Sequence, residues 1–282
     1  MIKERGREPI FVAGIDIGSV ATKSVILDES QAIIGFNIMP VGAIFRESGK
    51  DSFRQALSAA GIREEEVSYI VSTGYGRTSL RFAHHRVTEI TCHAKGVHKL
   101  FPSCRTVIDI GGQDSKAISI NDLGNVKNFA MNDRCAAGTG RWLEVIARVL
   151  NLSLDKMGEL ALRAKKEIRI SSVCTVFAES EVISYMTGGA QLEDVLGGVH
   201  RAIVERVVNS LVLRVGIVEE VALTGGVAKN IAIRREIEKA IGTKVSVPDE
   251  PQLTGALGAA LIGLEIIQNK NKVTQSRLTV TS

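Results

Sequence analysis

Two short segments of the chain combine a carboxylate with glycine in the same way. Asp16 and Asp109 each begin the tripeptide Asp-Ile-Gly, and each follows a short apolar stretch. A second apolar stretch comes after each glycine turn, which predicts two strand–turn–strand hairpins. Glycine lets backbone N–H groups approach an anion closely, and a carboxylate beside such a turn can hold Mg²⁺ through its waters. The two segments therefore predict phosphate and magnesium binding, with Asp16 and Asp109 on the metal side.

Side chains that could contact phosphate follow both turns. Asp and Gly are common in ordinary tight turns, but here the same pattern occurs twice. Lys23 could equally be a solvated lysine at a strand edge. Either Gln113 or Asp114 could orient the water that attacks a terminal phosphate, and the pattern does not rank them. The expected phosphate contacts are Gly18, Ser19, Thr22 and Lys23 in the first hairpin and Gly111 and Gly112 in the second.

A third glycine-rich junction lies later in the chain. Residues 218–223 form a strand candidate, followed by Thr-Gly-Gly and then by a helical pattern. Paired glycines at such a junction allow close approach of a flat ring or a ribose, so we expect Gly225, Gly226 and Asn230 to line an adenosine pocket. The chain has neither the Rossmann glycine pattern nor the Walker A sequence, which argues against those phosphate-binding folds.

Two of the four cysteines, Cys135 and Cys174, precede helical patterns. A helix N-terminus carries about half a positive charge and free N–H donors, which would stabilise a thiolate or an anionic iron–sulfur cluster. A four-iron cluster needs four thiolates, so two cysteines per chain suffice only in a two-fold dimer. The residue pattern alone leaves simple burial as an alternative, and we expect burial for Cys92 and Cys104.

The elements that must carry these residues alternate between strand and helix patterns, which predicts an α/β protein. With 282 residues and 45% hydrophobic content, the chain can bury a core in two lobes. We expect a first lobe of residues 1–93 plus 252–282 and a second lobe of residues 94–251. The first would include a C-terminal helix over residues 254–267, with a frayed tail from residue 269.

The amino-acid composition argues against several classes of protein. Aromatic residues make up 4% of the chain and the net charge is +4 without a long run of like charge, so we expect no nucleic-acid partner. We find no signal peptide and no window of ~18 uncharged apolar residues, so we expect no membrane span. Four cysteines without a Cys-x-x-Cys pair argue against a disulfide scaffold or zinc knuckle and indicate a reducing, cytoplasmic location.

The remaining polar motifs have structural interpretations. We expect Glu179 and Glu181 to be acids in the first turn of the helix after Cys174, where they would complement the helix dipole. Residues 72–77 (STGYGR) form a glycine-rich loop, with a plain turn, partner docking and a contact between lobes all left open. His84 and His85 indicate a metal only weakly, because no acidic or cysteine partner has ligand spacing near them.

The glycine motifs resemble those of a known superfamily. The segments that begin at Asp16 and Asp109, and Leu-Thr-Gly-Gly at residues 223–226, resemble the phosphate-1, phosphate-2 and adenosine motifs of the sugar kinase, heat-shock chaperone and actin superfamily. Residues 132–141 (NDRCAAGTGR) and 173–181 (VCTVFAESE) resemble a narrower group. That group is the ATP-dependent activators (component A) of 2-hydroxyacyl-CoA dehydratases, with benzoyl-CoA reductase ATPase subunits as close relatives. The resemblance covers residues 11 to 264.

This resemblance implies a two-lobed, actin-like (ribonuclease H-like) ATPase fold with the nucleotide in the interlobe cleft. It implies ATP and Mg²⁺ as ligands, and a homodimer with one [4Fe–4S] cluster held between the subunits by Cys135 and Cys174. Such an ATPase would accept an electron from a ferredoxin or flavodoxin and pass it at low potential to the dehydratase component. A small-molecule kinase, a nucleotide-dependent scaffold and an ATPase subunit of an aromatic acyl-CoA reductase are the alternatives.

Overall fold

The structure, a computed structural model, describes residues 9–171 and 174–280, with side chains as far as residue 271. Val173, which begins the VCTVFAESE segment, lies outside the described residues, as do residues 1–8, where a signal peptide would begin. The chain divides into two compact units, one of Met1–Gly96 with Leu253–Ser282 and one of Val97–Gln252. Each unit contains one mixed sheet covered by helices, which confirms the α/β class.

The sheet of the first unit has five strands. In sheet order they are β3 (Ile33–Pro40), β2 (Ala21–Leu27), β1 (Phe11–Ile17), β4 (Val67–Thr73) and β5 (His85–Arg86). β1 pairs antiparallel with β2 and parallel with β4, and β2 pairs antiparallel with β3. Every residue of β1 after the first is buried, as expected of a central strand that is covered on both faces.

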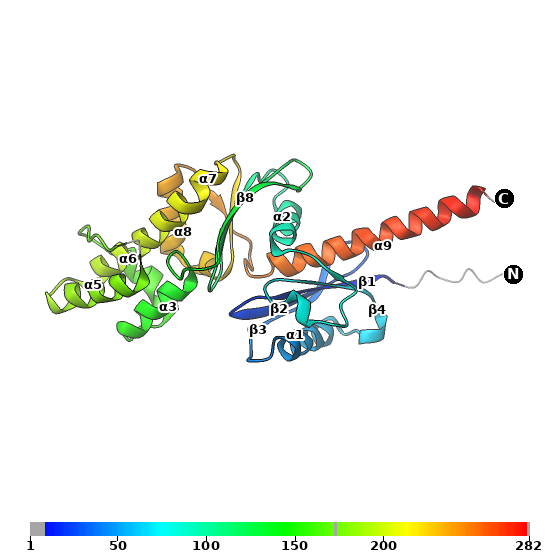
Figure 1. The fold of residues 1–282 in the computed structure, drawn as a ribbon, viewed down its shortest axis with the longest axis horizontal. Helices are drawn as coiled ribbons and strands as arrows, with labels where there is room; N and C mark the ends of the chain where they lie inside the picture. Colours follow the sequence, from blue (N-terminus) through cyan, green and yellow to red (C-terminus); the bar gives the residue numbers. More distant parts are fainter. Residues whose placement is uncertain (1–8, 172–173, 281–282) are drawn as a thin grey trace. The chain divides into compact units, whose positions relative to one another are not determined.

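Helices α1 (Phe45–Ala60) and α9 (Thr254–Val280) cover opposite faces of this sheet (Figure 1). Successive residues of β2 point to the two faces, as strand geometry requires. Ile26 packs with Phe53 of α1, whereas Leu27 packs against α9. The first face therefore carries the core beneath α1, and the second carries the side chains that lie beside α9.

Helix α9 lies directly on β1. Gly14 makes this possible, because a Cβ at this position would overlap the carbonyl oxygen of Ala256. The helix continues to Val280, so the expectation of a frayed tail from residue 269 is wrong. Extending a helix that has already nucleated costs little per residue, even where the sequence is polar and weakly patterned.

Helix α2 (Glu89–Leu100) also packs against α9 through glycines. A Cβ on Gly96 would overlap the carbonyl oxygen of Thr254, and a Cβ on Gly258 would overlap that of Cys92. The two backbones are therefore in close contact. This packing buries the side chains of Cys92, His93 and Thr254.

The second unit repeats the sheet topology of the first. In sheet order its strands are β8 (Val126–Asn132), β7 (Ser115–Ile120), β6 (Thr106–Ile110), β9 (Val221–Thr224) and β10 (Val245–Ser246). β6 pairs antiparallel with β7 and parallel with β9, and β7 pairs antiparallel with β8. β6 is therefore the equivalent of β1, and each of the two strands leads into one of the Asp-Ile-Gly turns.

Helices of the second unit gather around Trp142, which is fully buried with Ile108 and Ile203. Figure 1 shows α3, α5, α6 and α8 clustered together. The helical segments are α3 (Gly140–Val149), α4 (Leu154–Ala161), α5 (Thr175–Thr187), α6 (Leu192–Val207), a π-helical turn (Val208–Val212), α7 (Leu213–Val215), a 3-10 turn (Gly226–Lys229) and α8 (Ile231–Ile241). Among the described residues, we find no helix with the length and apolar character needed to cross a lipid bilayer.

Candidate functional site

Asp16 and Lys23 face each other across the first hairpin. They are register partners of β1 and β2, and Nζ of Lys23 lies 2.9 Å from Oδ2 of Asp16. The N–H of Gly18 donates to the carbonyl oxygen of Ala21 at 3.1 Å and closes the turn. Asp16 is buried, so the ammonium group of Lys23 offsets part of the cost of removing this carboxylate from water.

Asp109 and Lys116 form the equivalent pair in the second hairpin. They are register partners of β6 and β7, with Nζ of Lys116 3.0 Å from Oδ2 of Asp109. The N–H of Gly111 donates to the carbonyl oxygen of Asp114 at 2.9 Å. Lys116 also lies 2.6 Å from Oδ2 of Asp114, and its side chain is only 2% exposed. One buried lysine is thus shared by two carboxylates, which leaves one negative charge on the group.

A third strand completes each arrangement. Asp16 is in register with Thr73 at the end of β4, and Asp109 is in register with Thr224 at the end of β9. The hydroxyl of Thr224 donates to Oδ1 of Asp109 at 2.8 Å. Each carboxylate therefore lies between a lysine on one neighbouring strand and a threonine on the other.

Both threonines are followed by a glycine with positive φ, +84° at Gly74 and +85° at Gly225. A Cβ at Gly74 would overlap Oδ1 of Asp16, and a Cβ at Gly225 would lie 3.0 Å from Oδ1 of Asp109. Sequence reasoning treated residues 72–77 as a loop of open role and missed this equivalence. The available signal was the Thr-Gly dipeptide after a strand, which also occurs at residues 224–225.

Two glycines pack closely around the carboxylate of Asp16. Gly255, at the start of α9, borders the carboxylate on the side away from Gly74, and a Cβ there would lie 3.1 Å from Oδ2 of Asp16. Glycine at positions 74 and 255 thus lets the backbone approach the carboxylate closely. A carboxylate is a ligand that Mg²⁺ takes together with waters and phosphate oxygens, so the chemistry of Asp16 fits this ion. The described residues contain no group of three or more His, Cys, Asp or Glu side chains that could bind a metal by themselves.

The other residues expected to contact phosphate do not all lie on the same face of the first hairpin. Gly18, Ser19 and Gly112 are half-buried in the two turns. Thr22 is fully buried. Because side chains alternate along β2, it lies on the same face as Ser24. The hydroxyl of Ser24 lies 2.9 Å from that of Ser52 in α1, so this is the face covered by α1. Lys23 faces the opposite side. The phosphate contact of Thr22 stays a prediction.

Gln113 and Asp114 differ in their freedom to act on a water molecule. Asp114 is bound to Lys116 and folded over its own turn, because a Cβ on Gly111 would lie 2.5 Å from its Oδ1. Gln113 is exposed. Of the two candidates, Gln113 is therefore the side chain that can move toward a bound phosphate without breaking a buried ion pair.

Asn230, expected near adenosine, caps helix α8. Its Oδ1 accepts hydrogen bonds from the N–H groups of Ala232 and Ile233 at 3.0 and 3.2 Å. Its amide nitrogen lies 3.0 Å from Nε2 of His200, whose Nδ1 lies 2.7 Å from the carbonyl oxygen of Leu196. Nδ1 must donate to that carbonyl, so Nε2 accepts from Asn230. Burial lowers the pKa of His200 to about 4, which keeps the ring neutral.

The adenosine contacts of Gly225, Gly226 and Asn230 stay predictions. The positive φ of Gly225 favours glycine at this strand end, which precedes the 3-10 turn leading to α8. Gly226 is exposed.

The start of α3 is hydrogen-bonded to the turn of the second hairpin. The N–H of Gly140 donates to the carbonyl oxygen of Gly111 at 2.9 Å, and the N–H of Arg141 donates to that of Gly112 at 2.7 Å. The first N–H groups of a helix have no partner within the helix. Here two of them bind the backbone of the expected phosphate turn.

Cys135 lies in the loop that leads into α3, five residues before the helix begins. The side-chain amide of Asn132 donates to the carbonyl oxygens of Cys135 and Ala137 at 2.8 and 3.0 Å. The hydroxyl of Thr139 donates to the carbonyl oxygen of Ala136 at 2.7 Å. The loop is therefore held in one conformation, with the Cys135 thiol free and half-buried.

Cys174 is the N-cap residue of α5, and its thiol is also free and half-buried. Oε2 of Glu181 accepts a hydrogen bond from the N–H of Ser171 at 2.7 Å. The expectation that Glu179 and Glu181 are first-turn acids is wrong, because α5 begins at Thr175 and its first turn ends before them. Glu181 instead binds the backbone at Ser171.

The other two cysteines are fully buried, as expected. Burial raises the pKa of the Cys92 thiol to about 12 and that of Cys104 to about 11. Neither can be a thiolate near neutral pH. Cys135 and Cys174 are thus the two accessible thiols, and the helices that follow them, α3 and α5, pack against each other.

His84 has a structural role. Its Nδ1 accepts a hydrogen bond from the N–H of Ile70 at 3.0 Å, and its ring stacks on Tyr69 with centroids 4.9 Å apart. This environment does not fit a metal ligand.

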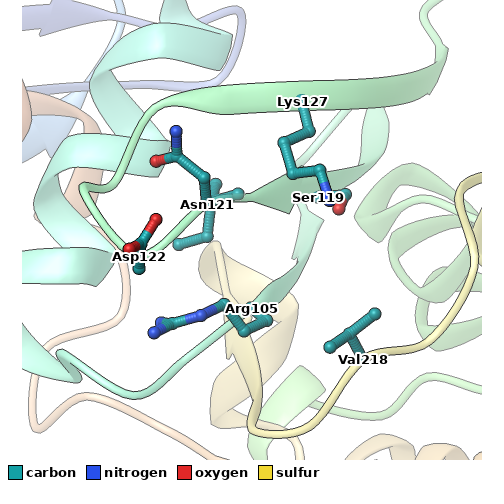
Figure 2. A pocket seen from close by; sticks show the side chains of 7 residues that line it. Arg105, Ser119, Asn121, Asp122, Lys127 and Val218 are labelled. Atoms are coloured by element: carbon teal, nitrogen blue, oxygen red, sulfur yellow. The ribbon is translucent and has the colours of Figure 1, made fainter.

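A pocket of about 310 Å³ lies at the far end of the second hairpin from Asp109. Figure 2 shows the side chains of Arg105, Asn121 and Asp122 around it, with Lys127 on the neighbouring strand. Arg105 precedes β6 and Asn121 follows β7, whereas the Asp109 turn joins the other ends of these strands. The pocket is therefore separate from the predicted phosphate site.

The duplicated sheet, with one Asp–Lys hairpin and one Thr-Gly strand end in each copy, defines an α/β ATPase of the actin-like and sugar-kinase fold. The chain belongs to the BadF/BadG/BcrA/BcrD ATPase family, which matches residues 13–263.

Relatives support this assignment over the full length. The chain is 46% identical over 262 residues to the activator of lactoyl-CoA dehydratase from Anaerotignum propionicum, covering 93% of this chain and 100% of that protein. Its structure is similar to the activator of the 2-hydroxyisocaproyl-CoA dehydratase from Clostridium difficile with bound ADPNP (TM-score 0.88, 40% identity, 93% and 97% coverage). It is also similar to component A of the Acidaminococcus fermentans (R)-2-hydroxyglutaryl-CoA dehydratase (TM-score 0.87, 41% identity, 91% and 98% coverage). The resemblance expected from the sequence is confirmed.

Proposed function

We propose that this chain is an ATP-hydrolysing iron–sulfur protein that transfers a low-potential electron to a 2-hydroxyacyl-CoA dehydratase. The observation that carries the proposal is full-length similarity, at 46% identity, to an activator of such a dehydratase. A small-molecule kinase is the weaker alternative, because the relatives at this identity are named as dehydratase activators. An ATPase subunit of an aromatic acyl-CoA reductase is an alternative within the same family.

The two Asp-Gly hairpins bind the phosphates of ATP in this proposal. Gly18, Ser19 and Lys23 contact phosphate from the first hairpin, and Gly111 and Gly112 contact it from the second. Asp16 and Asp109 hold waters of Mg²⁺, which when bound neutralises the charge of the phosphates. The placement of one such carboxylate at the start of each glycine turn supports this role.

Gln113 orients the attacking water. Phosphoryl transfer depends on positioning and charge neutralisation more than on covalent chemistry, and an exposed amide at the end of the phosphate turn suits that task. Asp114 has a different role, because it and Asp109 share the ammonium group of Lys116.

Cys135 and Cys174 are the proposed ligands of a [4Fe–4S] cluster. The thiols of one chain supply half of the ligands that a [4Fe–4S] cluster needs. One chain offers two half-buried free thiols, while Cys92 and Cys104 are buried and protonated. A homodimer supplies the four thiolates that the cluster requires. When bound, the cluster supplies a one-electron carrier whose potential depends on hydrogen bonding and solvent exposure.

The hydrogen bonds at the start of α3 support a coupling between the nucleotide and the cysteine loop. A shift of the Gly111–Gly112 backbone on hydrolysis moves the N–H groups of Gly140 and Arg141, and with them the loop that carries Cys135. ATP can drive such a change only by its different affinity for the two arrangements. The electron donor is a ferredoxin or flavodoxin, and free cysteines fit the reducing cytoplasm.

The test is iron and sulfide analysis with EPR spectroscopy on anaerobically purified protein sized by light scattering. We expect about four irons per dimer, the number in one cubane cluster. Cys135→Ser and Cys174→Ser should each lose the cluster, whereas Cys92→Ser should keep it. With ATP and a reduced ferredoxin, the wild type should activate a lactoyl-CoA dehydratase. A colourless monomer that hydrolyses ATP, even after cluster reconstitution, would refute the electron-transfer proposal and favour a kinase.

A further inference from the structure

A loop rich in positive charge lies between α4 and the segment that leads to Cys174. This basic loop, residues 163–169 (RAKKEIR), contains four cationic side chains and one acidic side chain, a net charge of +3, whereas the whole chain carries only +4. Its charged side chains are all exposed, and they are Arg163, Lys165, Lys166, Glu167 and Arg169. One loop therefore concentrates most of the excess positive charge of the protein.

Asp194 binds the backbone of the basic loop and not its ammonium groups. This buried residue lies in the first turn of α6, and its Oδ1 accepts hydrogen bonds from the N–H groups of Lys165 and Lys166 at 2.6 and 2.8 Å. The N–H groups of Lys166 and Lys165 lower the pKa of Asp194, so its carboxyl is ionised at neutral pH. Within the described part of the chain, none of the four cationic side chains of the loop forms an ion pair. Their charge is therefore available to a partner.

Two helices hold the basic loop in place. Arg201 of α6 donates to the carbonyl oxygen of Ile168 at 3.1 Å, and a Cβ on Gly198 would lie 2.6 Å from the same oxygen, so the loop packs directly on α6. On α5, the hydroxyl of Tyr185 donates to the carbonyl oxygen of Arg169 at 3.3 Å, and this tyrosine is 37% exposed. The cations therefore lie on a fixed support, beside an exposed aromatic residue of the helix that follows Cys174.

The chemistry of this surface fits an acidic protein. Soluble proteins usually intersperse charges of both signs, and a local excess of one sign attracts partners of the opposite sign and raises association rates by about 10- to 1,000-fold. Tyrosine and arginine are also the residues that contribute most often to protein–protein binding. A second copy of this chain does not fit, because a two-fold contact through the loop would bring the same cations together.

We propose that the basic loop docks the acidic face of a small one-electron carrier protein, the ferredoxin or flavodoxin of the proposed function. The inference rests on that function, since Cys174, a proposed cluster ligand, lies five residues after Arg169. In the docked complex one electron leaves the reduced carrier and enters the cluster, and no proton or chemical group is transferred. Electron-transfer partners bind through small, transient interfaces, in which charge steers the encounter and salt weakens it.

The test measures the second-order rate constant for reduction of the anaerobic holoprotein by an acidic two-cluster ferredoxin, by stopped-flow spectroscopy over a range of salt concentrations. The dissociation constant of the two oxidised proteins, from calorimetry, is a second readout that needs no turnover. Lys165→Gln/Lys166→Gln removes two positive charges from the loop, whereas Glu167→Lys makes the loop more positive. The matched control, Arg235→Gln/Lys239→Gln, removes two exposed positive charges from α8.

For Lys165→Gln/Lys166→Gln we expect the rate constant to fall by about three- to tenfold at low ionic strength, within the range of electrostatic steering. The dissociation constant should rise in parallel. Both differences should vanish near about 1 M salt, where the Debye length is about 3 Å. Glu167→Lys should speed the reduction, a result that a misfolded variant cannot produce. The α8 control should match the wild type. Protein reduced beforehand with titanium(III) citrate should activate the dehydratase equally well in the wild type and the loop variants.

Equal rate constants at low salt for the wild type, Lys165→Gln/Lys166→Gln and Glu167→Lys would overturn the inference. An equal slowing in the α8 control would also overturn it, because net charge and not the loop would then set the rate. Weaker activation by the pre-reduced loop variants, with normal reduction by ferredoxin, would assign the loop to the dehydratase instead. If titanium(III) citrate reduces no cluster in the wild type, the proposed function itself fails, and the two failures are thereby distinguished.

Discussion

The backbone N–H of Gly140 donates a hydrogen bond to the carbonyl oxygen of Gly111 at 2.9 Å. Gly111 belongs to the turn of the second Asp-Gly hairpin, and Gly140 is the first residue of α3, five residues after Cys135. The turn expected to bind the nucleotide and the cysteine-bearing loop are thus joined by this bond and by the one from Arg141 to Gly112. This relationship gives the coupling between ATP and the cluster a specific structural element to test.

Replacing Gly140 by proline should weaken the proposed coupling between the two sites. Proline is accepted at the first position of a helix, and Thr139 before it is already extended (φ −128°, ψ 169°). The proline Cδ replaces the N–H and would overlap the carbonyl oxygen of Gly111, so this contact is lost and the two segments are pushed apart. We expect ADP and ATP to alter the rate of iron chelation clearly less in Gly140→Pro than in the wild type, where both backbone hydrogen bonds are present.

The matched control is Gly140→Ala, which keeps the N–H but adds a Cβ 3.1 Å from the Gly111 carbonyl oxygen. It should keep most of the nucleotide response. If Gly140→Pro still responds like the wild type, the hydrogen bond does not carry the coupling.

Lys116→Met should strongly destabilise the second unit. The lysine is 2% exposed and contacts both Asp109 and Asp114. Removing one member of a buried ion pair typically costs about 3–5 kcal/mol, because the remaining charge stays buried without compensation. Trp142 is the single tryptophan of the chain and lies in the core of this unit, so urea unfolding followed by its fluorescence measures the effect.

Lys229→Met provides the comparison in the same unit. Lys229 is half-exposed and pairs with Glu250 at 2.9 Å. Exposed pairs contribute at most about 1 kcal/mol. If the two substitutions lower the free energy of unfolding equally, burial of the Lys116 ion pair is not important for stability.

His200 should make the second unit less stable in acid. Burial lowers its pKa to about 4 in the folded chain, from an ordinary value of 6.5. The unfolded chain therefore binds more protons in this range, so the stabilising contribution is fully present above pH 6.5 and is lost as the pH falls toward 4. The loss amounts to about 3 kcal/mol, at about 1.4 kcal/mol per pKa unit.

His200→Gln removes the titration while keeping a polar partner for Asn230. The difference in unfolding free energy between wild type and this variant, from Trp142 fluorescence in urea, should shrink between pH 6.5 and 4. A difference that does not change with pH would mean that His200 is protonated in the folded chain.

Gln113→Ala should slow ATP hydrolysis. We expect kcat to fall by about 10–100-fold with little change in KM, because a residue that orients water acts in the transition state and not in binding. Steady-state phosphate release measures this effect. Asp114→Asn should mainly lower stability, through Lys116. If Asp114→Asn remains folded and lowers kcat more than Gln113→Ala does, Asp114 and not Gln113 orients the attacking water.

Much of the site was predictable from the sequence because its parts are local. The strand–turn–strand pattern around Asp16 and Asp109, the helix after Cys174, and the α/β class each follow from alternation, turn residues and helical spacing within short windows. Burial of Cys92 and Cys104 was expected because a free cysteine outside a motif usually behaves as a small buried hydrophobe. Local patterns were less reliable for the end of α9, where a polar segment stays helical.

Other features depend on contacts between distant segments, which short patterns do not contain. The equivalence of Thr73-Gly74 and Thr224-Gly225 appears only when strand register sets each pair beside an aspartate. The burial of His93 and Thr254 depends on the glycine packing of α2 on α9. The sequence therefore determined which residues are candidates for the chemistry, through turn and strand preferences. The tertiary structure decided which of them meet, since that depends on register and close packing.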